Sequence, residues 1–402
     1  MFSKEETVWY NSKMHLKEIY LDNASTTPID PVVLEAMMPY LSVEYGNPSS
    51  LHKLGRTVKE TIEKSRREIA EYVGSETQEI IFTGGGTESD NLAMFGIARA
   101  NKQKGKHIIV SCIEHKAVLD VCKKLEHEGF EITYLDVDKN GFVSLKQLRS
   151  SLRKDTILVS IMYANNEIGT IQPIKKISKI LKQNKDINPI FHCDACQAAG
   201  VLPIKVRELG VDALTVSASK IYGPKGVGLF YINKKYTFEP IIYGGGQERG
   251  LRSGTENVAG IVGFSKAISI ADKKRVSENV RITKLRDYFI LQINKKIKDV
   301  YINGSLKERL PNNVNISIRG VEGESLVLLL DEKSVFCSTG SACSSIDLNP
   351  SHVLVRMGLP LDLAHCSVRF TLGRHTRKGD IDYTVKALVE CVNRIRSITT
   401  IK

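Results

Sequence analysis

The sequence has no long apolar run, and this limits where the protein is expected to act. Among its 402 residues, no apolar stretch reaches the roughly 18 residues needed to cross a bilayer. Residues 1–18 are polar, include Glu5 and Glu6, and lack the apolar core of a secretory signal. We therefore expect a cytoplasmic protein with no membrane partner.

Cysteine and clustered charge are also scarce. Eight cysteines in 402 residues are too few for a disulfide framework, and several lie in apolar runs, where reduced cysteine behaves as a small hydrophobe. The net charge of +12 is spread along the chain, and no stretch interleaves basic with aromatic residues. The composition therefore favours a reducing compartment and gives no support to a nucleic-acid partner.

What the sequence does contain is an alternation of apolar segments and helical patterns from residue 55 to about 270. Most of the apolar segments are continuous, as in strands covered on both faces. The expected strands are Ile80–Thr83, His107–Ser111, Ile132–Val137, Ile157–Tyr163, Ile190–Cys193, Leu214–Ser217 and Val227–Ile232. Amphipathic helices are expected between them, as at Val58–Val73 before Gly74 and at Ile174–Leu181. This pattern predicts an α/β fold with a seven-stranded, mostly parallel sheet flanked by helices.

The pattern changes after residue 270. Lys273–Lys298 predicts a long charged helix, and Ile381–Ile398 predicts a C-terminal one. Asn313–Ile318 and Leu326–Leu330 predict elements of a second, smaller α+β domain. The expected division is residues 1–27 as a segment packing with the small domain, 28–270 as the large domain, and 271–402 as the small domain with a Gly/Ser-rich loop at about 336–350.

Two motifs follow expected strands and suit a phosphate. Thr83–Ser89 has the sequence TGGGTES and opens an expected helix, whose free N–H groups favour an anion; a plain tight turn explains a glycine run equally well. Ser217-Ala218-Ser219-Lys220 ends another strand. A desolvated lysine can form a Schiff base, and the serines could donate to a phosphate, although a surface lysine is the simpler explanation of this motif alone.

A third motif, His192–Gln197, places Asp194 at the end of an apolar strand, where a carboxylate needs a cationic partner such as a protonated pyridine nitrogen. Cys193 and Cys196 have C-x-x-C spacing, but no second pair with that spacing exists, so we expect them to serve packing and expect no metal site.

A fourth motif is the Gly/Ser-rich segment around Cys343. A cysteine among small polar residues is expected to be exposed on a loop, as a reactive thiol needs to be. Cys337, after Val335 and Phe336, is expected in the core.

Together and in this order, the motifs resemble the cysteine desulfurases of the NifS/IscS type, in the class V aminotransferase superfamily of fold-type I pyridoxal-phosphate (PLP) enzymes. The likeness runs from Tyr20 to about Thr384. The segments that carry it are Tyr20–Thr27, Gly46–Ser50, Gly86–Asn91, Glu114–Val118, Asn165–Thr170, Asp194–Gln197, Lys220–Gly226, Gly246–Arg249 through Thr255–Asn257, Gly340–Ser345 and Val368–Phe370.

The resemblance implies roles for individual residues at the cofactor. Lys220 would carry PLP as a Schiff base and move protons, Asp194 would pair with the pyridine nitrogen, and Gln197 would bond the phenolic oxygen. His115 would stack on the ring and assist proton transfer. The phosphate would be held by residues from three segments, namely Gly86, Thr87, Ser217 and Ser219, with Thr255 acting on the other subunit of a homodimer.

For the substrate L-cysteine, the resemblance implies that Arg369 binds the carboxylate in the bidentate geometry that a guanidinium supplies. Asn165 would lie between cofactor and substrate, and Asn47 would also bind the substrate. Cys343 would attack the substrate sulfur, release alanine and pass its persulfide to an iron–sulfur scaffold protein or another acceptor. Whether Cys343 also ligates a transient iron–sulfur cluster is left open.

The chain departs from the commoner pattern at two positions. Ser219 stands where many relatives have histidine; a hydroxyl can still donate to a phosphate, so we expect PLP binding to survive. Gly86 stands where alanine is commoner, and we expect little consequence.

The alternative functions are an aminotransferase or a selenocysteine lyase on the same scaffold, and a catalytically silent scaffold for iron–sulfur assembly. An aminotransferase has no use for Cys343, whereas the sequence does not distinguish selenocysteine from cysteine.

Overall fold

The computed structural model describes residues 18–183, 186–340 and 350–398. Its centre is a seven-stranded sheet in the order β2-β8-β7-β6-β5-β3-β4. The strands are β2 (Ile80–Thr83), β3 (His107–Ser111), β4 (Glu131–Leu135), β5 (Thr156–Ser160), β6 (Ile190–Asp194), β7 (Ala213–Ser217) and β8 (Gly228–Ile232). Only β8 runs against its neighbours β2 and β7, so the predicted mostly parallel sheet is confirmed.

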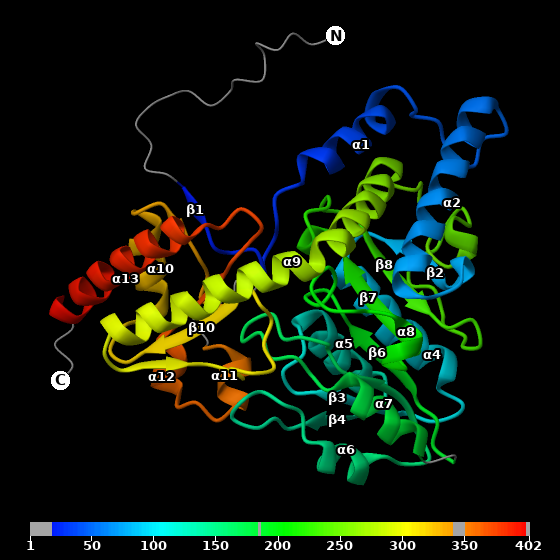
Figure 1. Ribbon diagram of the computed structural model, residues 1–402. Helices are drawn as coiled ribbons and strands as arrows, with labels where there is room; N and C mark the ends of the chain where they lie inside the picture. The colour runs from blue at the N-terminus through cyan, green and yellow to red at the C-terminus, as the bar shows by residue number, and fades with distance from the viewer. Residues whose placement is uncertain (1–17, 184–185, 341–349, 399–402) are drawn as a thin grey trace.

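The predicted burial of the sheet on both faces is also confirmed. Every residue of β3, β5, β6, β7 and β8 is buried, whereas the edge strand β4 is partly exposed. Helices cover both faces (Figure 1). They are α1 (Pro31–Ser42), α2 (Lys53–Val73), α3 (Gly86–Asn91), α4 (Ile97–Asn101), α5 (Lys116–His127), α6 (Leu145–Ser151), α7 (Ile174–Gln183) and α8 (Val206–Leu209). Gly74 ends α2 in the left-handed conformation, as its position predicts.

A smaller α+β unit follows. An antiparallel sheet orders its strands β12 (Ser367–Thr371), β10 (Asn313–Ile318) and β9 (Val300–Ile302). Beside it lie α10 (Gly323–Asp331), α11 (His352–Arg356), α12 (Leu361–His365) and α13 (Lys378–Ile398). The N-terminal strand β1 (Ile19–Tyr20) pairs in parallel with β11 (Val335–Phe336) of this unit.

Helix α9 (Val258–Lys296) runs across the molecule between the two units (Figure 1). It was expected to begin at Lys273, and it begins at Val258 instead. Its first half contributes Phe264 and Ile268 to the core of the large unit, and its second half contributes Phe289 and Ile293 to the core of the small one. The division at residue 270 therefore falls within a continuous helix, and the three-part division of the chain stays a prediction.

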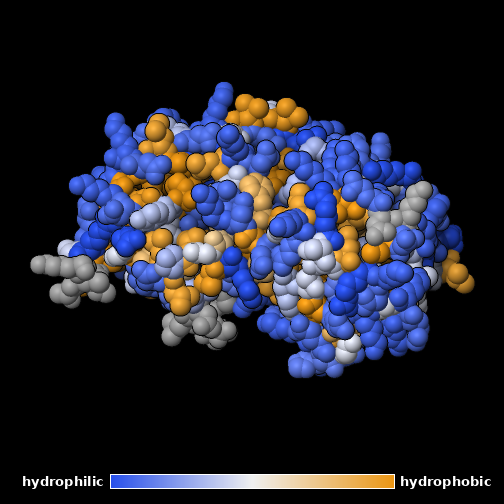
Figure 2. Space-filling view, turned by 90° about the horizontal axis from the view of Figure 1, so that it is seen from below, coloured by the Kyte–Doolittle hydropathy of each residue, from blue (hydrophilic) through white to orange (hydrophobic). Residues whose placement is uncertain are grey.

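The surface is mostly hydrophilic, with separate apolar patches on the face seen in Figure 2. Along the described part of the chain, no helix has the length and apolar character to cross a membrane.

Candidate active site

A cavity of about 720 Å³ opens where parallel strands of the large sheet end. The carboxyl ends of parallel strands are the usual ligand-binding edge of an α/β sheet. Nine of the residues singled out in the sequence line this cavity: Gly86, Thr87, His115, Asp194, Gln197, Ser217, Ser219, Lys220 and Arg369. The fold thus brings together segments that are more than 280 residues apart in the sequence.

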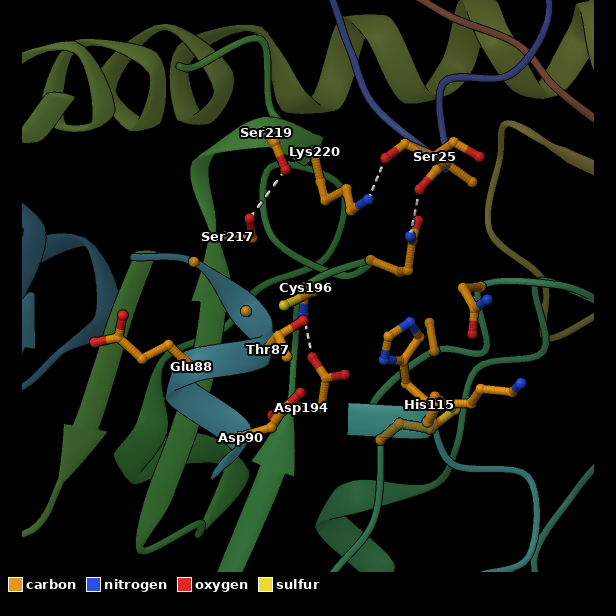
Figure 3. Close-up of a pocket in the computed structure, with 18 of the residues that line it drawn as sticks. Ser25, Thr87, Glu88, Asp90, His115, Asp194, Cys196, Ser217, Ser219 and Lys220 are labelled. Atoms are coloured by element: carbon orange, nitrogen blue, oxygen red, sulfur yellow. Dashed lines mark hydrogen bonds between the residues drawn. The ribbon is translucent and has the colours of Figure 1, made fainter. Parts of the chain in front are cut away.

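Lys220 lies in a short 3-10 turn directly after β7, with Ser217 at the end of the strand. Its Nζ donates to the backbone carbonyl of Ser25 (Figure 3). The hydroxyls of Ser217 and Ser219 are 3.0 Å apart. Two hydroxyls and an amine therefore face one end of the cavity, as a phosphate and a reactive carbonyl would require.

The turn between β2 and α3 completes this end. Gly85 has φ +143°, a conformation that side chains rarely adopt, and it lines the cavity at the start of the helix. The carboxylate of Glu88 accepts the Gly84 N–H at 2.9 Å and two bonds from Arg252, at 2.8 and 3.1 Å. These contacts fix the turn, so its N–H groups and the Thr87 hydroxyl suit an anion such as the PLP phosphate.

Gly86 is more tightly constrained than the sequence suggested. A Cβ at this position would lie 2.7 Å from the Sγ of Cys196, which also lines the cavity. The expectation that glycine in place of the commoner alanine has little consequence stays a prediction.

Three carboxyl groups are buried below the cavity. Asp194 ends β6 and its Oδ1 accepts the backbone N–H of Cys196 at 2.8 Å. Burial, and next the charge of Asp194, raise the pKa of Asp90 well above its ordinary value. Burial likewise raises the pKa of Glu114. A protonated pyridine nitrogen in the cavity would give the buried Asp194 carboxylate a cationic partner.

His115 forms the N-cap of α5, and its Nδ1 accepts the Ala117 N–H at 3.1 Å. Because Nδ1 accepts this bond, the neutral imidazole carries its proton on Nε2. The cap therefore fixes the tautomer of the ring that borders the cavity.

Arg369 lies on β12 of the small unit, with a side chain only 3% exposed. It donates to Asp22 at 2.7 Å, to Ser25 Oγ at 2.8 Å and to the Asn166 carbonyl at 3.0 Å. Its Nε is buried and has no hydrogen-bond partner among the described residues. A buried N–H without a partner is costly, and a carboxylate in the cavity would satisfy it.

The predicted role of Asn165 does not fit its position. Its side chain is completely buried outside the cavity, where it donates to the Ile113 carbonyl and accepts the N–H groups of Glu167 and Ile168. The neighbouring Asn166 lines the cavity instead. A pair of adjacent asparagines gave no signal that distinguished the two.

Asn47 and Thr255 are exposed and do not line this chain's cavity. Asn47 caps a local turn, since its Oδ1 accepts the Ser49 N–H. Thr255 follows the segment that Arg252 ties to Glu88. Glu88 and Asp90 lie within the glycine-turn segment that the sequence indicated, and Arg252 lies between Arg249 and Thr255, but no sequence pattern gave these three side chains a role in the site.

Cys343 lies outside the described residues. Gly340 and His352, on either side of residues 341–349, both line the cavity. Burial raises the pKa of each cysteine among the other seven, which favours the protonated thiol over the reactive thiolate; they are Cys112, Cys122, Cys193, Cys196, Cys337, Cys366 and Cys391.

Comparison with known proteins gives the class first. The family model Aminotransferase class-V matches residues 19–384. With this fold and this site, the chain belongs to the class-V aminotransferase family, whose members are PLP-dependent enzymes.

The relatives within that family are cysteine desulfurases. The cysteine desulfurase IscS of Dictyoglomus turgidum is 54% identical over 386 residues, which are 96% of this chain and 97% of that protein. The corresponding protein of Methanosarcina thermophila is 49% identical over 383 residues, covering 95% and 94%. Among solved structures, a NifS-like protein matches with a TM-score of 0.89 at 37% identity, covering 94% of this chain and 100% of that one. The structure of SspA in complex with cysteine matches with a TM-score of 0.77 at 35% identity, covering 88% and 98%.

Proposed function

We propose that the chain is a PLP-dependent cysteine desulfurase, which converts L-cysteine to L-alanine and transfers the sulfur to Cys343 as a persulfide. The observation that carries this proposal is the convergence of Lys220, Asp194, His115 and Arg369 on one cavity. The high identity to cysteine desulfurases over nearly the whole chain supports the choice of substrate.

For the cofactor, the chain supplies a lysine, a carboxylate and several hydroxyls. Lys220 would hold PLP covalently, Asp194 would pair with the ring nitrogen, and Gln197 would reach the phenolic oxygen. Thr87, Ser217 and Ser219, with the backbone at Gly86, would bind the phosphate. When bound, PLP withdraws electrons from the α-carbon of the amino acid attached to it.

For the substrate, Arg369 would bind the carboxylate through the guanidinium edge that includes the unpartnered Nε. Asn166 would contact the substrate from the same wall, in place of Asn165. Lys220 Nζ would accept the α-proton, and His115 Nε2 would exchange a proton on the opposite side of the cavity.

Cys343 would perform the sulfur transfer. Its thiolate attacks the substrate sulfur, so an S–S bond forms while the Cβ–S bond of cysteine breaks. The electron pair of the broken bond stays with the substrate carbon, which takes up a proton and leaves as alanine. The persulfide then awaits a thiol or a scaffold protein that accepts it.

We extend the proposal to a homodimer. One face of α1 and the segment after it expose apolar side chains while the opposite face packs on α9; the exposed ones include Leu34, Met38, Leu41, Val43 and Tyr45, at 45–72%. An apolar patch of this kind is typical of a subunit interface. Thr255 and Asn47 are exposed and do not line this chain's cavity, and they would serve the partner's. The double variant Met38→Glu/Leu41→Glu should then sediment as a monomer.

The cellular role that we propose is sulfur supply in the cytoplasm. The acceptor would be an iron–sulfur scaffold protein, and further acceptors would use the sulfur for tRNA or cofactor thiolation.

The test measures alanine and sulfide together, from PLP-loaded protein with L-cysteine and a reductant. Equal amounts of both products are expected from the wild type and from Cys391→Ala, a control that removes a thiol far from the cavity. Neither product is expected from Cys343→Ala. Alanine formation at the wild-type rate by Cys343→Ala would overturn the proposal.

A further inference from the structure

Cys196 belongs to the one sequence motif that the proposed function leaves unexplained. Its C-x-x-C partner Cys193 is fully buried in the core of the large unit. Cys196 instead lines the cavity next to Thr87 and Asp194 (Figure 3). The two cysteines therefore have different surroundings, and only Cys196 is placed to affect the site.

The Cys196 thiol fills the space beside the phosphate turn. The Cβ of any larger residue at position 86 would lie 2.7 Å from Sγ and 3.6 Å from the Ser217 Cβ. The first distance is far below the roughly 3.5–4.0 Å of ordinary van der Waals contact between carbon atoms. The backbone of Gly86 is at the start of α3 and does not have positive φ, so no conformational demand excludes alanine there. The thiol, and not the conformation of the turn, occupies the space that an alanine methyl group would take.

Cys196 is tied to Asp194 through its backbone. The Asp194 carboxylate accepts the Cys196 backbone N–H at 2.8 Å. Displacement of the Cys196 backbone away from an added Cβ would lengthen this bond. A clash at position 86 is therefore transmitted to the carboxylate below the cavity.

We propose that Gly86 and Cys196 form a size-matched pair that sets the position of Asp194 relative to the phosphate turn, with Cys196 as the positioning residue. The inference rests on the proposed function, because it assumes that PLP spans these two points. Alanine at position 86 pushes the phosphate turn and Asp194 apart, so the phosphate and the ring nitrogen no longer reach their partners at the same time.

The experiment compares wild type, Gly86→Ala, Cys196→Ala and the double variant Gly86→Ala/Cys196→Ala. PLP affinity is measured from the absorbance of the bound cofactor. An overpacked contact weakens binding by about 5- to 150-fold, and we expect a loss of this size in Gly86→Ala. Removing the thiol restores the space, so the double variant should bind PLP within about threefold of Cys196→Ala.

A spectroscopic measurement separates positioning from a general loss of stability. Displacement of Asp194 should shift the pH dependence of the bound cofactor's absorption in Gly86→Ala, and the double variant should recover the wild-type profile. Wild-type affinity in Gly86→Ala, or no recovery in the double variant, would overturn the proposal.

Failure of the proposed function has a different signature. If the wild type binds no PLP, the proposed function fails, but the steric pairing is still measurable by thermal unfolding. Gly86→Ala should melt at a lower temperature than wild type. The double variant should melt no lower than Cys196→Ala. Should Gly86→Ala fail to fold, the double variant provides the second test. It should fold and bind PLP because the space at position 86 is restored, and its failure to fold would overturn the pairing.

Discussion

At the scale of single residues, the burial of Glu114 makes the stability of the fold depend on pH. Its side chain is completely buried, one carboxyl oxygen accepts the Met162 N–H, and the other has no hydrogen-bond partner among the described residues. Burial raises its pKa above the ordinary 4.5, so above about pH 4.5 the folded protein keeps a proton that the unfolded chain releases. This group's contribution to stability is therefore present at low pH and is lost as pH rises towards its folded pKa.

Glu114→Gln should remove this dependence, because an amide mimics the protonated acid without titrating. From about pH 5 up to the folded pKa of Glu114, the variant should gain stability relative to wild type by up to about 1.4 kcal/mol per pH unit. Urea unfolding at several pH values measures this difference, with the exposed Glu60→Gln as control. A difference between Glu114→Gln and wild type that stays constant with pH would contradict the assignment.

The adjacent asparagines provide a matched pair for a second experiment. Asn165→Ala removes a fully buried amide and leaves the Ile113 carbonyl and two N–H groups without partners, so it should cost about 1–3 kcal/mol of stability for each group left unsatisfied. Asn166→Ala should leave stability nearly unchanged and should lower kcat/KM for cysteine. Thermal unfolding and steady-state kinetics on both variants check this. A loss of kcat/KM in Asn165→Ala together with a loss of stability in Asn166→Ala would show that Asn165 is the residue of the site.

At the scale of elements, the turn between β2 and α3 is held by an ion pair between Glu88 and Arg252. Glu88→Gln keeps an oxygen for the Gly84 N–H but loses the charge that Arg252 pairs with. PLP affinity should fall by about 5- to 30-fold, as expected for a charge-assisted contact that is partly buried. Glu128→Gln is the control, because it breaks a similar bidentate pair with Arg99 that is remote from the cavity. Equal PLP affinities in the two variants would show that the Glu88–Arg252 ion pair does not preorganise the turn.

The elements themselves were largely predictable. All seven strands of the large sheet were expected within a few residues of their observed bounds, because continuous apolar runs between helices are a strong signal for a parallel sheet. The antiparallel direction of β8 was not predictable, because an apolar run does not indicate the direction in which a strand runs. The first part of α9 was also missed: residues 258–271 are apolar on most sides, because they pack against both α1 and α2 and so lack the one-sided pattern of a surface helix.

The site was predictable only in part. Motifs of adjacent residues indicated Lys220, Asp194 and the glycine turn, since each pattern is local. The Arg252–Glu88 pair and the partners of Arg369 join residues 164 and 347 positions apart, and no local pattern contains such contacts.

At the scale of the whole molecule, α9 is the element that connects the two cores. Val276, 68% exposed, lies between the residues that pack into the large unit and those that pack into the small one. Val276→Pro should kink the helix at a cost of about 3 kcal/mol and shift Arg369 relative to the PLP end of the cavity. KM for cysteine should rise while PLP remains bound, as measured by kinetics and absorbance. Val276→Ala should behave as wild type, and an unchanged KM in the proline variant would refute this role of the helix.

The contact between Asp22 and Arg369 has a consequence for biosynthesis. The two residues are 347 positions apart and meet at the cavity wall, next to the pairing of β1 with β11. At roughly 5–20 residues per second, the ribosome makes them about 17 to 70 seconds apart. The nascent chain can thus assemble the large sheet long before Arg369 emerges, so the pocket acquires last the wall that we propose to bind the substrate carboxylate. A chain that stalls before this point would carry the lysine and the phosphate turn without the means to select an amino acid.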